Sequence, residues 1–278
     1  MSEQPHPVAT GEPANGLEWF GREVEEALAH KEGASQRGLA EATGYKEPYV
    51  SKVKNGKSMP SPQFAEGCDR YFNTSGWFAR ILVRISERGH PNWFIPYVNL
   101  ERDASRVEDY SNAFVMGMLQ THEYAEAGFR ATHPRETDDQ IKARAEARLR
   151  RRDVMLRKDP PLLWVILHES VLRTVVGSPG VMAAQLGHLV AEAATPHITL
   201  QVLPFKAGAP ASSLPFTLLT PGSGATVLYS ETRDQGHVND SATAVGGAKA
   251  TYERLRAAAL SPDESVTLIR QIAEDHAR

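Results

Sequence analysis

The sequence has little cysteine, no long apolar run and almost no net charge, and each scarcity excludes a class of protein. A single cysteine, Cys68, leaves no partner for an internal disulfide, which fits a reducing cytoplasm. No apolar run approaches the length of a membrane span, so we expect a soluble cytoplasmic protein without a membrane partner. A formal net charge of −3 over 278 residues excludes a bulk binder of polyanions. Any binding to nucleic acid must therefore depend on a local patch.

The sequence also lacks the motifs of catalysis and metal binding. It contains no HExxH, no GxSxG, no P-loop and no paired CxxC, and its ten histidines are scattered. His168, Glu169 and Ser170 are residue types that occur in catalytic sites. Neighbours along a strand point to opposite faces, however, which favours a polar cluster at a strand end. Cys68 lies among apolar positions and fits a core better than a nucleophile. We therefore expect no enzyme, no cofactor and no metal.

The length predicts about two domains. Residues 1–16 are polar, rich in proline and glycine and unlike a signal peptide, so we expect a disordered tail. Apolar positions spaced for amphipathic helices follow over 17–88. The Gly-His-Pro-Asn turn at 89–92 marks a boundary, and 89–278 would form the second domain.

One segment of the first domain carries the strongest local signal. A short helix over 35–43 is followed by Gly44, where the chain must reverse in the left-handed region. A second helix over 47–55 ends at Gly56. This order predicts a helix-turn-helix whose second helix enters the DNA major groove, although an ordinary helical hairpin has a similar outline.

If the second helix enters the groove, two groups of side chains face the DNA. Positions early in this helix reach base edges, namely Glu47, Pro48, Ser51 and Lys52. Positions around them suit phosphates, namely Gln36, Lys46, Lys54, Asn55 and Lys57. Lys52 could donate to guanine, and Glu47 could accept from cytosine. The alternative is that the lysines are solvated surface charges and that Glu47 merely repels phosphate.

The second domain shows a mixture of helix and strand patterns. Strand patterns occur at 162–167, 198–203, 216–220 and 227–230, the last two joined by a hairpin connection. Helix patterns occur at 93–104, 121–131, 137–158, 179–195, 241–260 and 262–276. The sequence therefore predicts a mainly α head followed by an α+β domain.

Two further features of the second domain suggest binding surfaces. The segment from 142 to 158 contains eight basic residues and only two acidic ones. Four of them form a candidate docking surface for an acidic partner or DNA backbone, namely Arg148, Arg150, Arg151 and Arg152. We expect reversal of the charges at 150–152 to weaken binding without unfolding, unless this is an ordinary solvated face.

Aromatic residues could in addition line an apolar ligand pocket, although plain core positions have similar spacings. The candidates are Trp93, Phe94, Tyr97, Tyr110, Phe114 and Trp164.

The sequence resembles known regulators in both halves. The first domain is similar to the Cro/lambda-repressor or XRE-type class at Gln36, Leu39, Ala40, Gly44, Tyr49, Val50, Ser51, Asn55, Gly56, Lys57 and Pro60. The phrases WF at 93–94, YVNLE at 97–101, GMLQT at 117–121, ITLQVLPF at 198–205 and LYSE at 228–231 resemble the WhiJ-type actinobacterial regulators. Helical patterns that continue to residue 88 predict a five-helix head. The resemblance implies that this Cro-like head is coupled to a dedicated C-terminal regulatory domain, with a role in development or antibiotic production.

We therefore expect a sequence-specific transcriptional regulator that binds double-stranded DNA. Two-fold operators require paired recognition helices, so a homodimer is expected. The resemblance also implies a small partner protein encoded by a neighbouring gene, in a toxin–antitoxin-like arrangement. The alternative function is an antitoxin-like interaction module that sequesters such a partner, with the helix-turn-helix kept as a scaffold.

Overall fold

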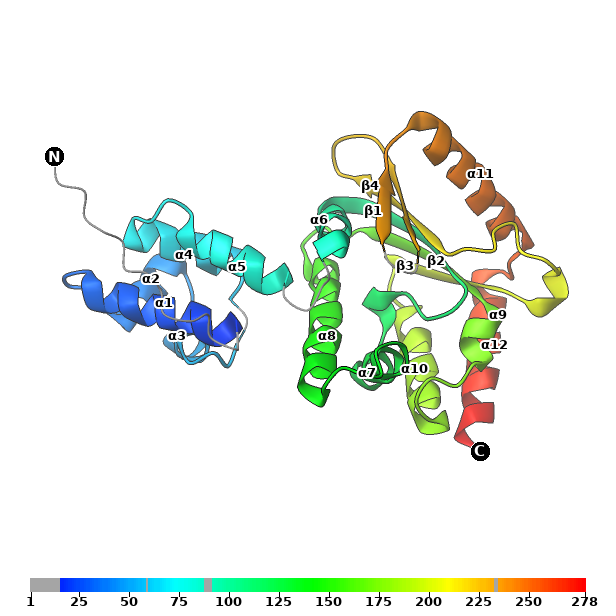
Figure 1. The fold of residues 1–278 in the computed structure, drawn as a ribbon, viewed down its shortest axis with the longest axis horizontal. Helices are drawn as coiled ribbons and strands as arrows, with labels where there is room; N and C mark the ends of the chain where they lie inside the picture. The colour runs from blue at the N-terminus through cyan, green and yellow to red at the C-terminus, as the bar shows by residue number, and fades with distance from the viewer. Residues whose placement is uncertain (1–15, 59, 88–91, 233–234) are drawn as a thin grey trace. The chain divides into compact units, whose positions relative to one another are not determined.

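The structure, a computed structural model, describes residues 16–58, 60–87, 92–232 and 235–278 (Figure 1). The chain divides into two compact units, Met1–Arg88 and Gly89–Arg278. The tail expected over 1–16 lies outside the described residues except for Gly16, which begins the first helix. Most of the expected turn at 89–92 also lies outside them.

The N-terminal unit consists of helices around a single apolar core. The helices are α1 (Gly16–His30), α2 (Gln36–Thr43), α3 (Glu47–Lys54), α4 (Pro62–Phe72) and α5 (Trp77–Glu87). Two serines fix helix starts, because the Ser35 hydroxyl accepts from the Gly38 N–H and the Ser61 hydroxyl from the Phe64 N–H. All five helices contribute buried side chains to the core, including Phe20, Leu39, Val50, Phe64 and Phe78.

The C-terminal unit is built on a six-stranded mixed sheet. Its strands are β1 (Ala104–Ser111), β2 (Leu162–His168), β3 (Ile198–Leu203), β4 (Phe216–Pro221), β5 (Val227–Glu231) and β6 (Gly236–Asn239). Their order across the sheet is β3-β2-β1-β4-β5-β6. Strand β1 pairs in parallel with β2, and β2 with β3, whereas β4, β5 and β6 continue the sheet in antiparallel fashion.

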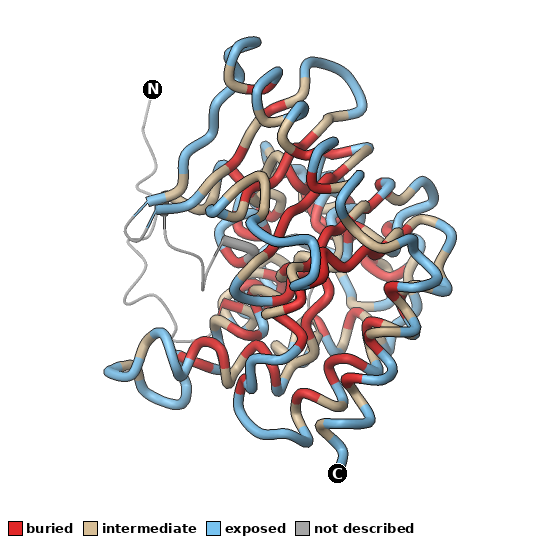
Figure 2. Tube along the Cα trace, turned by 90° about the vertical axis from the view of Figure 1, so that its right-hand side faces the viewer, coloured by how far each residue is buried: buried red, intermediate tan, exposed pale blue. Residues whose placement is uncertain are grey.

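Helices cover both faces of this sheet, as Figure 1 shows. They are α6 (Ile95–Asp103), α7 (His122–Thr132), α8 (Asp138–Arg150), α9 (Glu169–Arg173), α10 (Pro179–Glu192), α11 (Ala242–Ala258) and α12 (Pro262–Ala277). Along β2, Val165 and Leu167 join the core shared with α10 and α12, whereas Ile166 joins the core shared with α11. The buried stretches along the sheet and the exposed outer sides of the helices are visible in Figure 2. Burial on both faces explains why β2 is an almost unbroken apolar run.

The fold class predicted from the sequence, an α head followed by an α+β domain, is confirmed. The four predicted strands are β2, β3, β4 and β5, with ends shifted by at most one residue. The predicted helices over 179–195, 241–260 and 262–276 correspond to α10, α11 and α12.

The observed elements differ from the expected ones in two ways. The helix predicted over 137–158 is wrong in its second half, because α8 ends at Arg150 and Arg151–Leu156 form a 3-10 helix. Strands β1 and β6 correspond to no strand pattern noted in the sequence. Strand β1 is central, yet it carries Glu108 and Asp109, residue types that are depleted in strands, so its propensity is overridden by its place in the sheet.

Candidate nucleic-acid interface

The turn between α2 and α3 has the geometry that a helix-turn-helix requires. Gly44 adopts φ 76°, in the left-handed region, and the Tyr45 N–H then donates to the Ala40 carbonyl at 3.0 Å. The Gln36 side-chain amide donates to the Glu47 carbonyl at 3.4 Å, which ties the start of α2 to the start of α3. The angle between the two helices is thus held from both ends of the turn.

Helix α3 is fixed by one apolar face and presents the other outward. Val50 and Val53 are 0% and 1% exposed and pack into the core. The opposite face is exposed or half-buried and follows the spacing i, i+3, i+4, i+7, with Pro48, Ser51, Lys52 and Asn55. Three of the four predicted base-reading residues therefore share one outward face, and Glu47 is exposed beside it.

The start of α3 has an unusual cap. Lys46 occupies the N-cap position and makes no side-chain capping bond. Pro48 lies in the first turn, where its missing N–H has no helical partner to lose. Lys46, Glu47 and Pro48 are all exposed, so this end of the helix is open to solvent.

The predicted phosphate contacts differ in how available they are. Lys46 and Lys57 are exposed, whereas Lys54 forms an ion pair with Glu25 of α1 at 3.1 Å and keeps 25% of its side chain exposed. The Asn55 amide donates back to the Ser51 carbonyl at 2.8 Å. These two contacts hold Lys54 and Asn55 against the protein, so Lys46 and Lys57 are better placed to reach phosphates.

Sequence reasoning missed three residues that border this surface or fix the helices of the N-terminal unit. Arg37 is exposed in the first turn of α2 and pairs with Glu41 at 3.0 Å. Gly21 of α1 faces the end of α3 so closely that an added Cβ would lie 2.2 Å from the Lys54 carbonyl oxygen. The Asp69 carboxylate accepts from the Phe78 and Ala79 N–H groups, both at 3.0 Å, and so caps α5 from α4. Of the three, only Arg37 could have been found from the sequence, because it lies next to Gln36, a predicted phosphate contact.

Comparison with family models assigns both units. A model described as a helix-turn-helix domain matches residues 19–76. A second model, described as a domain of unknown function (DUF5753), matches residues 94–271, more than half of the chain. The chain belongs to the DUF5753 family. No curated protein and no solved structure gives a match.

The N-terminal unit is thus a helix-turn-helix domain and the C-terminal unit a DUF5753 domain. The combination agrees with an XRE-like regulator that binds DNA, whereas the WhiJ-type assignment stays a prediction. Among the described helices, none combines the length and apolarity needed to cross a membrane.

The arginines of the candidate basic surface are largely engaged within the DUF5753 domain. Arg151 is 6% exposed and forms two bonds of 2.7 Å with the Glu101 carboxylate. Burial by itself would lower the pKa of Arg151, but the charge and hydrogen bonds of Glu101 raise it above its usual value. Arg152 pairs with Glu192 at 2.6 Å, and Arg150 lies 3.9 Å from Glu146.

The expectation of an exposed basic docking face is therefore wrong for Arg151, and Arg152 has an intramolecular partner. The fourth arginine, Arg148, points to a different feature. It lines a cavity of about 470 Å³ together with Trp93, Phe94, Tyr97 and Phe114, four of the six predicted pocket aromatics. The other two predictions are wrong, since Tyr110 lies in the core shared with α11 and the half-buried Trp164 packs against that core.

The polar side chains at the end of β2 form hydrogen bonds within the domain. The His168 imidazole lies 2.7 Å from the Ser170 hydroxyl and caps α9, while that hydroxyl donates to the Asn112 carbonyl. The Glu169 carboxylate accepts from Arg173 and from the Phe205 N–H, both at 2.7 Å. Cys68 is fully buried, and burial raises the pKa of its thiol. Within the described ranges, no three His, Cys, Asp or Glu residues gather as metal ligands.

Proposed function

We propose that this protein is a sequence-specific transcriptional regulator that acts as a homodimer on a two-fold operator. The observation that supports the proposal is the outward face of α3, where Pro48, Ser51 and Lys52 stand on a helix whose other face is locked by Val50 and Val53. A helix that is fixed in this way can present side chains to base edges in the major groove.

The proposed roles follow from the chemistry of each side chain. Lys52 donates to guanine, Ser51 makes a hydrogen bond to a base edge, and Glu47 accepts from cytosine N4. Lys46, Lys57 and the start of α2 at Gln36 contact phosphates and set the register on the duplex. Phosphate contacts make the affinity dependent on salt.

The DUF5753 domain would supply dimerisation, control of DNA binding, or both. A two-fold operator needs two recognition helices about one turn of DNA apart, which a single chain cannot provide. We expect regulation by binding alone, with no catalytic step. A small partner protein encoded by a neighbouring gene stays a prediction, as do the roles in development and in a toxin–antitoxin-like arrangement.

Fluorescence anisotropy tests the proposal on DNA from upstream of the protein's own gene. The titration is run at two salt concentrations and with scrambled competitor DNA. We expect binding that survives the competitor, and a loss of about 1–3 kcal/mol on Lys52→Ala with relaxed discrimination at one base pair. The combined variant Ser51→Ala and Lys52→Ala should lose specific binding altogether.

The matched control is Lys249→Ala, because Lys249 is an exposed lysine on α11 of the other domain. It should bind the operator as the native protein does. An equal loss on every sequence with Lys52→Ala would make Lys52 a phosphate contact. Weak binding that falls equally on all DNA as salt rises would instead favour the interaction module, with the helix-turn-helix as a scaffold.

A further inference from the structure

The cavity of the DUF5753 domain is formed by segments that are far apart in the sequence. The 3-10 helix Asn92–Phe94 and α6 supply one wall, α7 and α8 supply another, and β5 contributes Tyr229. Its volume of about 470 Å³ falls within the roughly 300–1,000 Å³ that is common for small-molecule sites. The cavity is therefore large enough for an organic ligand with at least one ring.

One wall of the cavity consists of aromatic rings in contact with one another. The ring centres of Phe94 and Tyr97 are 4.9 Å apart, and those of Tyr97 and Tyr229 are 4.2 Å apart. Phe114 and Phe129 also line the cavity, and Phe114 is 37% exposed. Flat apolar surfaces of this kind favour a planar ring.

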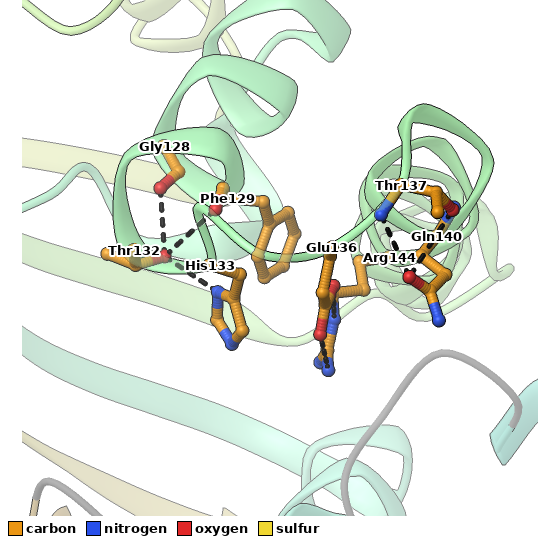
Figure 3. A network of polar contacts seen from close by, with 8 residues as sticks. All are labelled: Gly128, Phe129, Thr132, His133, Glu136, Thr137, Gln140 and Arg144. Atoms are coloured by element: carbon orange, nitrogen blue, oxygen red, sulfur yellow. Dashed lines mark hydrogen bonds and ion pairs between the residues drawn. The ribbon is translucent and has the colours of Figure 1, made fainter.

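Three arginines reach the same cavity, and two of them are neutralised by carboxylates. Arg151 forms the two bonds with Glu101 described above. Arg144 forms two bonds of 2.6 Å with Glu136 at the α7–α8 connection, where Thr137 and Gln140 complete a capping box (Figure 3). The positive charges of Arg151 and Arg144 are therefore each balanced by a carboxylate within the domain.

Arg148 is different. Its Nη1 donates to the Gln120 side-chain oxygen at 3.1 Å, and its guanidinium lies 3.9 Å from the centre of the Phe129 ring. These partners are an amide and an aromatic ring, and among the described residues no carboxylate forms an ion pair with Arg148. Burial, followed by the positive charge of Arg151, lowers the pKa of Arg148 to about 10, although Glu231 acts in the opposite direction. The guanidinium is still protonated at neutral pH.

Two acids line the cavity, and each accepts hydrogen bonds from hydroxyl groups that also line it. The Asp109 oxygens accept from the Ser111 and Thr217 hydroxyls at 2.6 and 2.8 Å. Glu231 is exposed and accepts from the Tyr229 hydroxyl at 2.8 Å. The cavity thus combines aromatic walls with Arg148, whose charge has no ion-pair partner in the part of the chain that the structure describes. A planar guanidinium is well suited to a carboxylate.

We propose that the cavity of the DUF5753 domain binds a small aromatic carboxylate, with its ring against the aromatic wall and its carboxylate on Arg148. The inference goes beyond the proposed DNA binding, because it concerns a separate site in the other domain. It is tested without DNA, so its failure and the failure of the DNA-binding proposal are distinguishable.

Isothermal titration calorimetry on the full chain tests the ligand class with matched probes. The probes are 1-naphthoate and indole-3-acetate, each compared with its uncharged amide. At the usual ligand efficiency, molecules of this size bind with a Kd on the order of 1 mM. We expect each carboxylate to bind about tenfold more tightly than its amide, because only the carboxylate forms a charge-assisted pair.

Two variants test the location from different directions. Arg148→Gln should abolish the preference for the carboxylate, whereas Lys142→Gln, the same charge change at an exposed position of α8, should leave it intact. Gly128→Leu should block binding by filling the cavity. A Cβ at Gly128 would lie 3.7 Å from the Phe114 ring, an ordinary contact, so the new side chain leaves α7 beside a cavity-lining ring without a backbone clash at its Cβ.

Circular dichroism establishes that each variant is folded, and the Gly128→Leu arm stands if Arg148→Gln fails to fold. Binding of the carboxylates that is selective over the amides and lost in both cavity variants supports the proposal. Three results overturn it: no binding of either carboxylate up to about 10 mM, well above the affinity expected for its size, equal affinity for acid and amide, or unchanged binding in Gly128→Leu.

Discussion

Arg151 shows how a single charge is accommodated in the core of the DUF5753 domain. Its guanidinium is satisfied by both oxygens of Glu101 and lies about 5 Å from the rings of Phe94 and Tyr97. The Tyr97 hydroxyl also donates to Glu101 at 2.8 Å. A buried pair of this kind is destabilising when one partner is removed, because the other charge remains without compensation.

We therefore expect Arg151→Glu to unfold the DUF5753 domain rather than to alter a binding surface. Two carboxylates would face each other in a buried site, at a cost of about 3–5 kcal/mol. Urea denaturation followed by circular dichroism measures the loss. Lys142→Glu, on the exposed side of α8, is the control and should change the free energy of unfolding by less than about 0.5 kcal/mol. Similar effects of the two variants would contradict the role assigned to Arg151.

Asp109 gives a prediction about pH. Burial raises the pKa of this carboxyl from 3.8 to about 6, although its bonds to Ser111 and Thr217 oppose the shift. The folded state thus binds the proton more tightly than the unfolded state does. This contribution to stability is complete below about pH 4 and is lost as the pH rises to about 6, with a total on the order of 3 kcal/mol.

Asp109→Asn should remove this pH dependence, because the amide does not titrate. Other carboxyls have lowered pKa values and act in the opposite direction, so the informative quantity is the difference between native protein and variant. Urea unfolding at several pH values between 4 and 7 measures that difference. A difference that stays constant over this range would show that the Asp109 carboxyl has an ordinary pKa.

At the scale of elements, the position of the recognition helix depends on a close contact between α1 and α3. Gly21 allows the two backbones to approach, and the Lys54–Glu25 ion pair lies beside that contact. Val50 and Val53 set the rotation of α3 about its axis, whereas Gly21 sets how closely α1 packs against its end. A helical pattern in the sequence indicates the first of these constraints but gives no sign of the second.

We expect Gly21→Ala to destabilise the helix-turn-helix domain and to weaken DNA binding together. The new methyl group would meet the Lys54 carbonyl oxygen, and such overpacking costs about 1–3 kcal/mol. Gly187→Ala is the matched control, because this glycine lies in α10 with open space around it, where alanine favours the helix. Thermal unfolding and anisotropy measure the two effects. An unchanged operator affinity in a destabilised Gly21→Ala would show that α3 keeps its position without this contact.

At the scale of the whole molecule, the two domains have separate cores. The buried residues of the N-terminal core lie between Phe20 and Ile85, and those of the other cores between Tyr97 and Ile272. Each domain therefore has its own apolar core, as an independently folding unit requires.

This separation predicts two unfolding transitions. Asp69→Ala should lower only the transition of the helix-turn-helix domain, because it removes the acceptor for two N–H groups at the start of α5, at a cost of about 1–3 kcal/mol. Differential scanning calorimetry of the full chain separates the transitions. A shift of both transitions by the same amount would contradict independent unfolding. Glu66→Ala, at an exposed position of α4, is the control.

The sequence by itself determined the features that local patterns encode. Glycines at 44 and 56 and the spacing of Val50 and Val53 are signals within a few residues, and they predicted the helix-turn-helix. The apolar run of β2 and the strand patterns of β3, β4 and β5 are equally local, and they predicted these four strands. The outward face of α3 followed from the same spacing, since a helix that buries one side exposes the other.

Only the tertiary structure decided the features that depend on contacts between distant residues. A charged segment became the central strand β1 because β2 and β4 pair with it on both sides. A basic stretch that resembles a solvated face became a buried ion pair because Glu101 lies 50 residues earlier in the chain and next to Arg151 in space. The cavity and the charge of Arg148 arise in the same way, since charge compensation is a property of the folded neighbourhood and not of the local sequence.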